Sequence, residues 1–159
     1  MLVSVNVMSE SLLPSPSPVT SPVRVWLIED SPQWQVALKQ WLPLLCQSLG
    51  GVDLALCEGS KTEAEDRLQQ LYPIGEYHAT QHAPHLVLLD WQLTDGYTGL
   101  EFGKIIETTY GVPTERILFI SEAFPEGDLH QVPYAHLPKS QLMRSKERLL
   151  ATIQQAQNV

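Results

Sequence analysis

Cysteine is scarce in this chain, whose 159 residues include two cysteines, Cys46 and Cys57. So low a content excludes a disulfide-stapled scaffold and predicts a protein of the reducing cytoplasm. Both thiols are interpreted as small core residues, with redox sensing as the alternative.

Positive charge is also scarce, and long apolar runs are missing. The chain has 10 Lys and Arg against 18 Asp and Glu, a formal net charge of −8 and a pI near 5.0. A nucleic-acid-binding module needs a basic face for phosphate contacts, so direct nucleic-acid binding is not expected. No uncharged apolar run is long enough to cross a bilayer, so no membrane association is expected. The acidic balance suits a carboxylate-rich site or a basic partner, and the length favours one domain.

The N-terminal segment contains no Lys or Arg and is rich in proline and serine from Ser11 to Pro22. A secretory signal peptide needs a positive segment before its apolar stretch, and none is present here. Alternating prolines favour extended backbone without internal hydrogen bonds. Residues 1–22 are therefore predicted to form a flexible tail, and residues 23–157 a single folded domain.

From Val23 onward, short apolar runs alternate with stretches of helical periodicity. The runs that predict strands are residues 23–28, 52–57, 85–89, 117–120 and 132–137. Helices are predicted to follow the N-cap residues Ser31, Ser60 and Ser140 and to span residues 100–110. Pro43 is expected to kink or shorten the first helix. Strands that alternate with helices predict an α/β fold, a doubly wound parallel sheet with helices on both faces.

Polar residues follow four of these strands at the point where each strand ends. They are Glu29 and Asp30 after the first strand, Asp90 after the third, Ser121 after the fourth and Lys139 after the fifth. Because the carboxyl ends of parallel strands meet at one edge of a sheet, these side chains are expected to converge. Adjacent carboxylates raise one another's pKa unless a cation neutralises them, and Mg²⁺ prefers such oxygen ligands. With a hydroxyl and an ammonium alongside, the set suits phosphoryl transfer, with Asp90 placed to attack phosphorus.

Residues 23–157 resemble the receiver domain of two-component response regulators. The matching features are Glu29-Asp30, the Leu-Leu-Asp90 strand end, Ser121 after Ile-Leu-Phe-Ile, Lys139, and the loop from Asp90 to Gly99. The resemblance implies a flavodoxin-like receiver fold, with five parallel strands in the order 2-1-3-4-5. It also implies that Asp90 accepts a phosphoryl group from a histidine kinase or histidine phosphotransfer protein of a bacterial two-component system.

The same resemblance implies roles for the other converging residues. The Mg²⁺ ligands it implies are the side chains of Glu29, Asp30 and Asp90 and the backbone carbonyl of Gln92. Ser121 would hydrogen-bond the new phosphoryl group and Lys139 would pair with it, which shifts such domains between two nearby states. Only one predicted helix follows Lys139, so a stand-alone, non-enzymatic response regulator is expected. Its output would be binding to an unknown downstream protein or onward phosphorelay.

The sequence departs from the family pattern around the last two strands. Glu122 follows the switch serine, where the family has a small residue, and this anion is expected to slow phosphorylation or occlude the site. His136 stands three residues before Lys139, at the position of the switching aromatic, and is interpreted as a partly buried substitute. Pro138 precedes the lysine instead of a proline following it. The segment between Ser121 and Lys139 is shorter than usual, which shrinks or removes the fourth helix.

Other conspicuous residues receive structural interpretations. Three histidines before the third strand are expected to be exposed loop residues rather than metal ligands: His78, His82 and His85. Three tryptophans are expected to pack in or around the core: Trp26, Trp34 and Trp41. The fourth, Trp91, is next to Asp90 and is a candidate to border the site.

Two other functions stay open at this point. One is a receiver-like binding or adaptor domain that no longer uses phosphate, which Glu122 and the altered loop at Lys139 suggest. The other is a haloacid-dehalogenase-type phosphatase, because Leu-Leu-Asp90-Trp-Gln-Leu-Thr94 also resembles its aspartate-nucleophile motif. That family uses a second aspartate two residues on as general acid and base, whereas Gln92 at this position cannot transfer a proton.

Overall fold

Five parallel strands form one sheet in the part of the chain that the computed structural model describes, residues 21–93, 98–122 and 134–158. The strands are β1 (Val23–Ile28), β2 (Val52–Glu58), β3 (Leu86–Asp90), β4 (Ile117–Ser121) and β5 (Ala135–Pro138). The helices are α2 (Pro32–Leu45), α3 (Lys61–Leu71), α4 (Ala79–His82), α5 (Gly99–Tyr110), α6 (Lys139–Leu142) and α7 (Lys146–Gln157). Two 3₁₀ turns complete them, η1 (Gln47–Leu49) and η2 (Thr114–Arg116).

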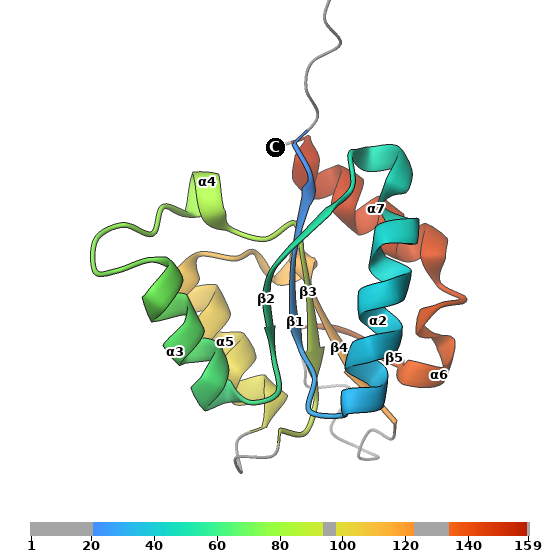
Figure 1. Ribbon diagram of the computed structural model, residues 1–159, viewed down its shortest axis with the longest axis horizontal. Coiled ribbons are helices and arrows are strands. Elements are labelled where there is room, and N and C mark those ends of the chain that lie inside the picture. Colours follow the sequence, from blue (N-terminus) through green and yellow to red (C-terminus); the bar gives the residue numbers. More distant parts are fainter. Residues whose placement is uncertain (1–20, 94–97, 123–133, 159) are drawn as a thin grey trace, which may run out of the picture.

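The strand order is β2-β1-β3-β4-β5, which confirms the predicted fold class and topology. Helices α3 and α5 cover one face of the sheet, and α2 and α7 cover the other (Figure 1). Every residue of β3 is buried, because this central strand is covered on both faces. Successive side chains of a strand point to opposite faces, so each strand contributes to two separate cores.

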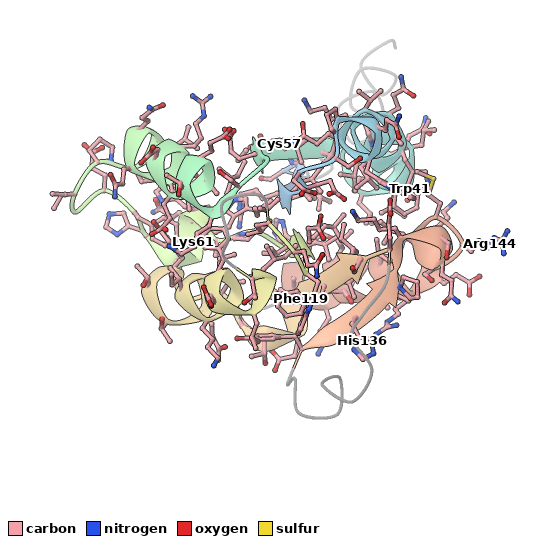
Figure 2. All side chains as sticks on the ribbon, turned by 90° about the horizontal axis from the view of Figure 1, so that it is seen from below. Trp41, Cys57, Lys61, Phe119, His136 and Arg144 are labelled. Atoms are coloured by element: carbon pink, nitrogen blue, oxygen red, sulfur yellow. The ribbon has the colours of Figure 1, made fainter. Side chains whose placement is uncertain are left out.

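The first core lies under α3 and α5 and includes Trp26, Ile28 and Phe119. The second lies under α2 and α7 and includes Leu27, and Trp41 packs against this second core. Figure 2 shows Phe119 beside α5 and Trp41 on α2, at opposite faces of the sheet. No helix of the described segments is both long and apolar enough to span a membrane.

The cysteines and tryptophans lie largely as predicted. Cys46 is fully buried in the second core, and burial raises the pKa of its thiol to about 11, which keeps it protonated and unreactive. Cys57 is half-buried against the same core. Trp26 is fully buried, and Trp34 packs on the second core from the start of α2.

Side-chain caps fix the starts of the main helices. The hydroxyl of Ser31 accepts a hydrogen bond from the Trp34 amide, and that of Ser60 from the Glu63 amide, as predicted. Thr98 caps α5 in the same way through Glu101. Helix α2 contains Pro43 and ends shortly after it, at Leu45, in agreement with the expected shortening.

The end of the chain differs from the single helix predicted after Ser140. Ser140 lies inside the short helix α6, whose N-cap is Pro138, and a separate helix α7 begins at Lys146. At the break, the Ser145 amide donates to the Leu142 carbonyl at 3.1 Å, three residues back, and Ser145 leaves the helical conformation to become the N-cap of α7. Placing Ser140 as the cap of one continuous helix was therefore wrong.

The stretch before β3 also differs from the predicted exposed loop. It contains the short helix α4, and His85 is buried with 8% of its surface exposed. The backbone of His85 donates to the Arg24 carbonyl at 2.8 Å, and its Nδ1 atom accepts from the Arg24 amide at 2.9 Å. Pairing with β1 thus buries this histidine, and the expectation of exposure was wrong for it. His78 is exposed, as predicted, and its amide donates to Nδ1 of His82, which is half-buried beside the Tyr72 ring rather than exposed.

Some sequence predictions fall outside the described residues. These are the tail up to residue 20, the loop at residues 94–97, and residues 123–133, where the fourth helix was expected to shrink and where the fifth strand was predicted to begin.

Candidate functional site

The carboxyl ends of β1, β3, β4 and β5 meet at one edge of the sheet, at the lower end of Figure 1. A cavity of about 410 Å³ opens at this edge. The residues that line it are Asp30, Ser31, Asp90, Gln92, Ser121, Glu122 and Lys139. The convergence expected from the order of strand ends is therefore present, and the cavity is strongly polar.

The acidic pair is held by the turn from β1 into α2. The Glu29 amide donates to the Glu58 carbonyl at 2.9 Å, which extends the pairing of β1 with β2. Oε2 of Glu29 accepts from the Ser31 amide at 3.2 Å, and the Gln35 side chain donates to the Glu29 carbonyl at 2.6 Å. These contacts hold the fully buried Glu29 carboxylate while Asp30 faces the cavity.

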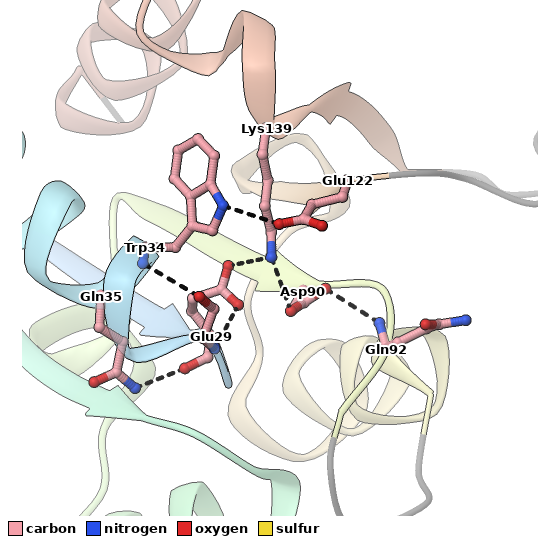
Figure 3. Close-up of polar contacts among 8 residues, drawn as sticks. Glu29, Trp34, Gln35, Asp90, Gln92, Glu122 and Lys139 are labelled. Carbon is pink, nitrogen blue, oxygen red and sulfur yellow. Dashed lines mark hydrogen bonds and ion pairs between the residues drawn. The ribbon is translucent and has the colours of Figure 1, made fainter.

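Lys139 begins α6 and carries its ammonium into the middle of the carboxylates (Figure 3). The side chain is 5% exposed, and Nζ lies 2.5 Å from Oε1 of Glu29 and 3.2 Å from Oδ2 of Asp90. Burial alone would lower the pKa of this ammonium, but the bonds to Glu29 and Asp90 outweigh burial and raise it. Lys139 is therefore a fixed positive charge at the pocket floor.

Asp90 ends β3 and is the most centrally placed of the carboxylates. Oδ1 accepts from the Gln92 amide at 3.2 Å, and Oδ2 accepts from Lys139. Burial raises the pKa of Asp90 to about 6, and the adjacent Glu29 carboxylate adds to the rise against the opposing effect of Lys139. Burial and the Asp90 carboxylate likewise raise the pKa of Asp30.

Three carboxylates therefore share this edge with one ammonium. Glu29, Asp30 and Asp90 each offer an oxygen, and these oxygens lie within 4.8 Å of one another. Burial is the main cause of the raised pKa values of Asp30 and Asp90, and the crowding of the carboxylates adds to the rise, while Lys139 opposes it. A hard divalent cation would relieve that crowding, so the donor set fits Mg²⁺.

The loop after Asp90 is held close to the strand by a glycine. The Gly99 amide donates to the Trp91 carbonyl at 2.7 Å. A Cβ atom at Gly99 would lie 2.1 Å from the carbonyl oxygen of Asp90 and 3.0 Å from the Phe119 ring. The first turn of α5 therefore packs directly against the backbone that carries Asp90, and no side chain fits between them.

Ser121 and Glu122 line the mouth of the cavity, and Trp34 contacts Glu122 beside it. Ser121 ends β4 and is 5% exposed, whereas the next residue, Glu122, is exposed. The indole nitrogen of Trp34 donates to the Glu122 carboxylate at 3.3 Å, and Lys139 Nζ lies 5.9 Å from the centre of the Trp34 ring (Figure 3). Trp34 thus joins the site, although its helical spacing indicated only a core position.

The remaining candidates lie away from the cavity. Trp91 is not among the lining residues, because its ring is buried edge-on against Phe119 in the first core. His136 is half-buried on β5, paired in register with Phe119. Sequence reasoning missed Tyr134, a buried aromatic that packs on Phe119 and donates to the Glu107 carboxylate at 2.6 Å. The signal available in the sequence was an aromatic residue two positions before His136, close to where the switching aromatic was expected.

Neither a protein-family model nor a curated protein matches the chain. Solved structures do match. The signal receiver domain of a modulated diguanylate cyclase from Desulfovibrio desulfuricans is 18% identical, with 87% of this chain and 98% of that chain covered and a TM-score of 0.61. The receiver domain of the putative response regulator NarL from Mycobacterium tuberculosis is 21% identical, with 87% and 99% covered and a TM-score of 0.59.

The Mn²⁺-bound response regulator Rcp1 is 21% identical, with 86% of this chain and 93% of that chain covered and a TM-score of 0.51. At these identities the likeness establishes the fold. The chain has the fold of response-regulator receiver domains.

Proposed function

We propose that the protein is a phosphoacceptor signalling domain of the response-regulator class and that Asp90 is the residue phosphorylated. The observation that supports this most directly is the position of the Asp90 carboxylate. It ends the central strand, contacts the Lys139 ammonium and lies beside the Glu29 and Asp30 carboxylates. The receiver fold supports the same function.

In the proposed reaction, an oxygen of Asp90 attacks the phosphorus of a phosphohistidine on a histidine kinase or phosphotransfer protein. An O–P bond forms while the N–P bond of the donor breaks, so the imidazole leaves and an acyl phosphate remains on Asp90. Lys139 would pair with the transferred group, and the Ser121 hydroxyl would donate to one of its oxygens.

The donor set for Mg²⁺ in this proposal is Glu29, Asp30 and Asp90, together with the backbone carbonyl of Gln92. When bound, the ion would neutralise charge on the transferred phosphoryl group. The pull of that group on Ser121 and Lys139 would shift the surface of β4 and β5, and a downstream protein would read the change. The proposal places the protein in the cytoplasm of a bacterium, with protein binding or phosphorelay as its output.

Labelling with acetyl phosphate and Mg²⁺, followed by intact-mass and peptide mass spectrometry, tests this function. One phosphoryl group per chain is expected on Asp90, with none in Asp90→Asn or in EDTA, because the acceptor oxygen or the neutralising cation is then removed. Asp66→Asn, which changes an exposed carboxyl on α3, is the matched control and is expected to label normally. Labelling that persists in Asp90→Asn would refute the assignment.

A phosphate-independent adaptor is the second candidate, and one observation favours it. Lys139 already bridges Glu29 and Asp90, and the Trp34–Glu122 contact lies at the mouth of the cavity. Failure to label under conditions that label an ordinary receiver would favour the adaptor. Steady turnover of a phosphate monoester would instead revive the phosphatase, although Gln92 is exposed and carries no transferable proton.

The charge of Glu122 is expected to slow phosphorylation. Its carboxylate lines the cavity that an anionic phosphodonor must enter. At an exposed site, one like charge contributes about 0.5–1 kcal/mol, so Glu122→Gln should label about two- to fivefold faster with acetyl phosphate. The difference should shrink as salt is raised, because exposed charges are screened.

Glu115→Gln is the matched control for this effect, since Glu115 is exposed near the opposite end of β4. Its labelling rate should equal that of the wild type. Equal rates for Glu122→Gln and the wild type at low salt would show that the carboxylate does not hinder the donor.

A further inference from the structure

A second cavity, of about 390 Å³, lies at the opposite edge of the sheet, where β1, β3 and β4 begin. This is the upper end of the sheet in Figure 1, opposite the end at which β3 reaches Asp90. Its polar lining includes Arg24, which is the second residue of β1, His85 directly before β3, and Arg116 directly before β4. The end of α7 contributes Gln157. Strand pairing brings these residues together, because β1 and β4 both flank β3.

His85 presents a hydrogen-bond donor to this cavity. Its Nδ1 atom accepts the Arg24 amide at 2.9 Å, so in the neutral ring the proton must sit on Nε2. Burial, assisted by the charges of Arg24 and Arg116, lowers the pKa of the imidazole to about 4, so the ring is neutral near pH 7. No described residue hydrogen-bonds Nε2, and the ring lines the cavity.

Each arginine is anchored by one backbone contact and keeps other N–H groups available. Nε of Arg24 donates to the Ala83 carbonyl at 2.8 Å, and Nη1 of Arg116 donates to the Pro84 carbonyl at 3.2 Å. Neither guanidinium forms an ion pair with a carboxylate in the described segments. Burial and the charge of Arg24 lower the pKa of Arg116, against a smaller opposing effect of Glu115.

We propose that this cavity binds a small oxyanion, the phosphate or carboxylate group of a compact ligand, between Arg24, Arg116 and the Nε2–H of His85. The three groups are hydrogen-bond donors, and two are cationic in a chain whose net charge is −8. An oxyanion offers acceptors for the His85 Nε2–H and for the N–H groups that the two arginines keep available, and paired guanidinium groups suit its geometry. The volume corresponds to the small end of ligand pockets. The proposal does not depend on phosphorylation of Asp90.

The full chain, kept in EDTA, can be titrated with inorganic phosphate and separately with citrate, with sodium chloride of equal ionic strength as reference. Binding is followed by calorimetry and by the thermal midpoint. At least one oxyanion should bind saturably and raise the midpoint beyond the chloride effect, because a ligand that binds the folded state stabilises it. Preference for phosphate or for citrate then identifies the ligand class.

Arg24→Gln and Arg116→Gln should each weaken this binding about tenfold or more, since each removes a charged donor. Arg67→Gln and Arg144→Gln, at exposed arginines elsewhere, are matched controls that should leave it unchanged. His85→Asn keeps an acceptor for the Arg24 amide, removes the Nε2–H, and should also weaken binding. Circular dichroism establishes whether each variant is folded. The oxyanion affinity of any one folded cavity variant is then enough to test the proposal.

Two results would overturn the proposal. One is that neither phosphate nor citrate binds beyond the chloride reference. The other is that the cavity variants bind as the wild type does while Asp90→Asn or Lys139→Met loses binding, which would locate the anion at the phosphorylation site. Retention of binding in Asp90→Asn would support a separate oxyanion site. Phosphorylation of Asp90 is tested independently by the labelling experiment with acetyl phosphate.

Discussion

Lys139→Met should lower the free energy of unfolding by about 3 kcal/mol when Mg²⁺ is removed with EDTA. The ammonium of Lys139 lies 2.5 Å from a Glu29 oxygen and 3.2 Å from an Asp90 oxygen, and all three side chains are buried. Removing one partner of a buried ion pair leaves a desolvated charge without compensation, which is why the cost is large. Methionine has a similar length, so little of the loss should come from packing.

Urea denaturation monitored by tryptophan fluorescence measures this loss. Lys146→Met is the matched control, because Lys146 is exposed on α7, and it should change stability by less than about 0.5 kcal/mol. The double variant Glu29→Gln/Lys139→Met should recover part of the loss, since it removes one of the uncompensated carboxylates. If Lys139→Met were as stable as the wild type in EDTA, the ion pair would contribute nothing to folding.

Mg²⁺ should restore part of the stability of Lys139→Met and should stabilise it more than the wild type. The cation and the lysine compensate the charge of the same three carboxylates. When the lysine is absent, the bound cation therefore stabilises the folded protein more. A ligand that binds only the folded state stabilises it by mass action. An identical response of the two proteins to Mg²⁺ would argue that the carboxylates do not form the metal site.

The sheet and its polar edge were predictable because both follow from local signals. Apolar runs such as His85–Leu89 identify buried strands, and a parallel sheet brings the carboxyl ends of those strands to one edge. Asp90 and Lys139 are far apart in sequence, but each follows a strand, so their meeting needs no knowledge of helix packing. The strand topology alone is therefore enough to predict that Asp90 and Lys139 meet.

Contacts between a helix and a strand end were not predictable in the same way. The hydrogen bond from Trp34 to Glu122 depends on the rotation of α2 about its own axis and on its position along the sheet. Residue spacing specifies neither of these. The burial of His85 depends on the register between β1 and β3. The break after α6 lies in the backbone conformation of Ser145, whose amide bonds the Leu142 carbonyl, and hydrophobic periodicity does not specify it.

Gly99→Ala should disturb the candidate site more than any conservative change outside its charged residues. The new methyl group would lie 2.1 Å from the Asp90 carbonyl oxygen, so the backbone of α5 or of β3 must move. Overpacking of this kind costs about 2–3 kcal/mol of stability. Displacing the Asp90 carboxylate by about 1 Å should lower the rate of labelling with acetyl phosphate about a hundredfold.

Gly59→Ala separates this effect from the general consequence of adding a methyl group near the site. Gly59 lies beside Asp30, as Gly99 lies beside Asp90, but a Cβ atom at Gly59 would meet its nearest neighbours at 3.8 Å. The backbone of Gly59 is not in the left-handed region. This variant should keep the wild-type labelling rate and gain up to about 1 kcal/mol in stability, because alanine restricts the unfolded chain. Chemical denaturation and time-resolved mass spectrometry measure both quantities. A Gly99→Ala protein that labels as fast as Gly59→Ala would mean that the phosphoacceptor backbone tolerates the shift, or that Asp90 is not the acceptor, and the Asp90→Asn measurement distinguishes these two outcomes.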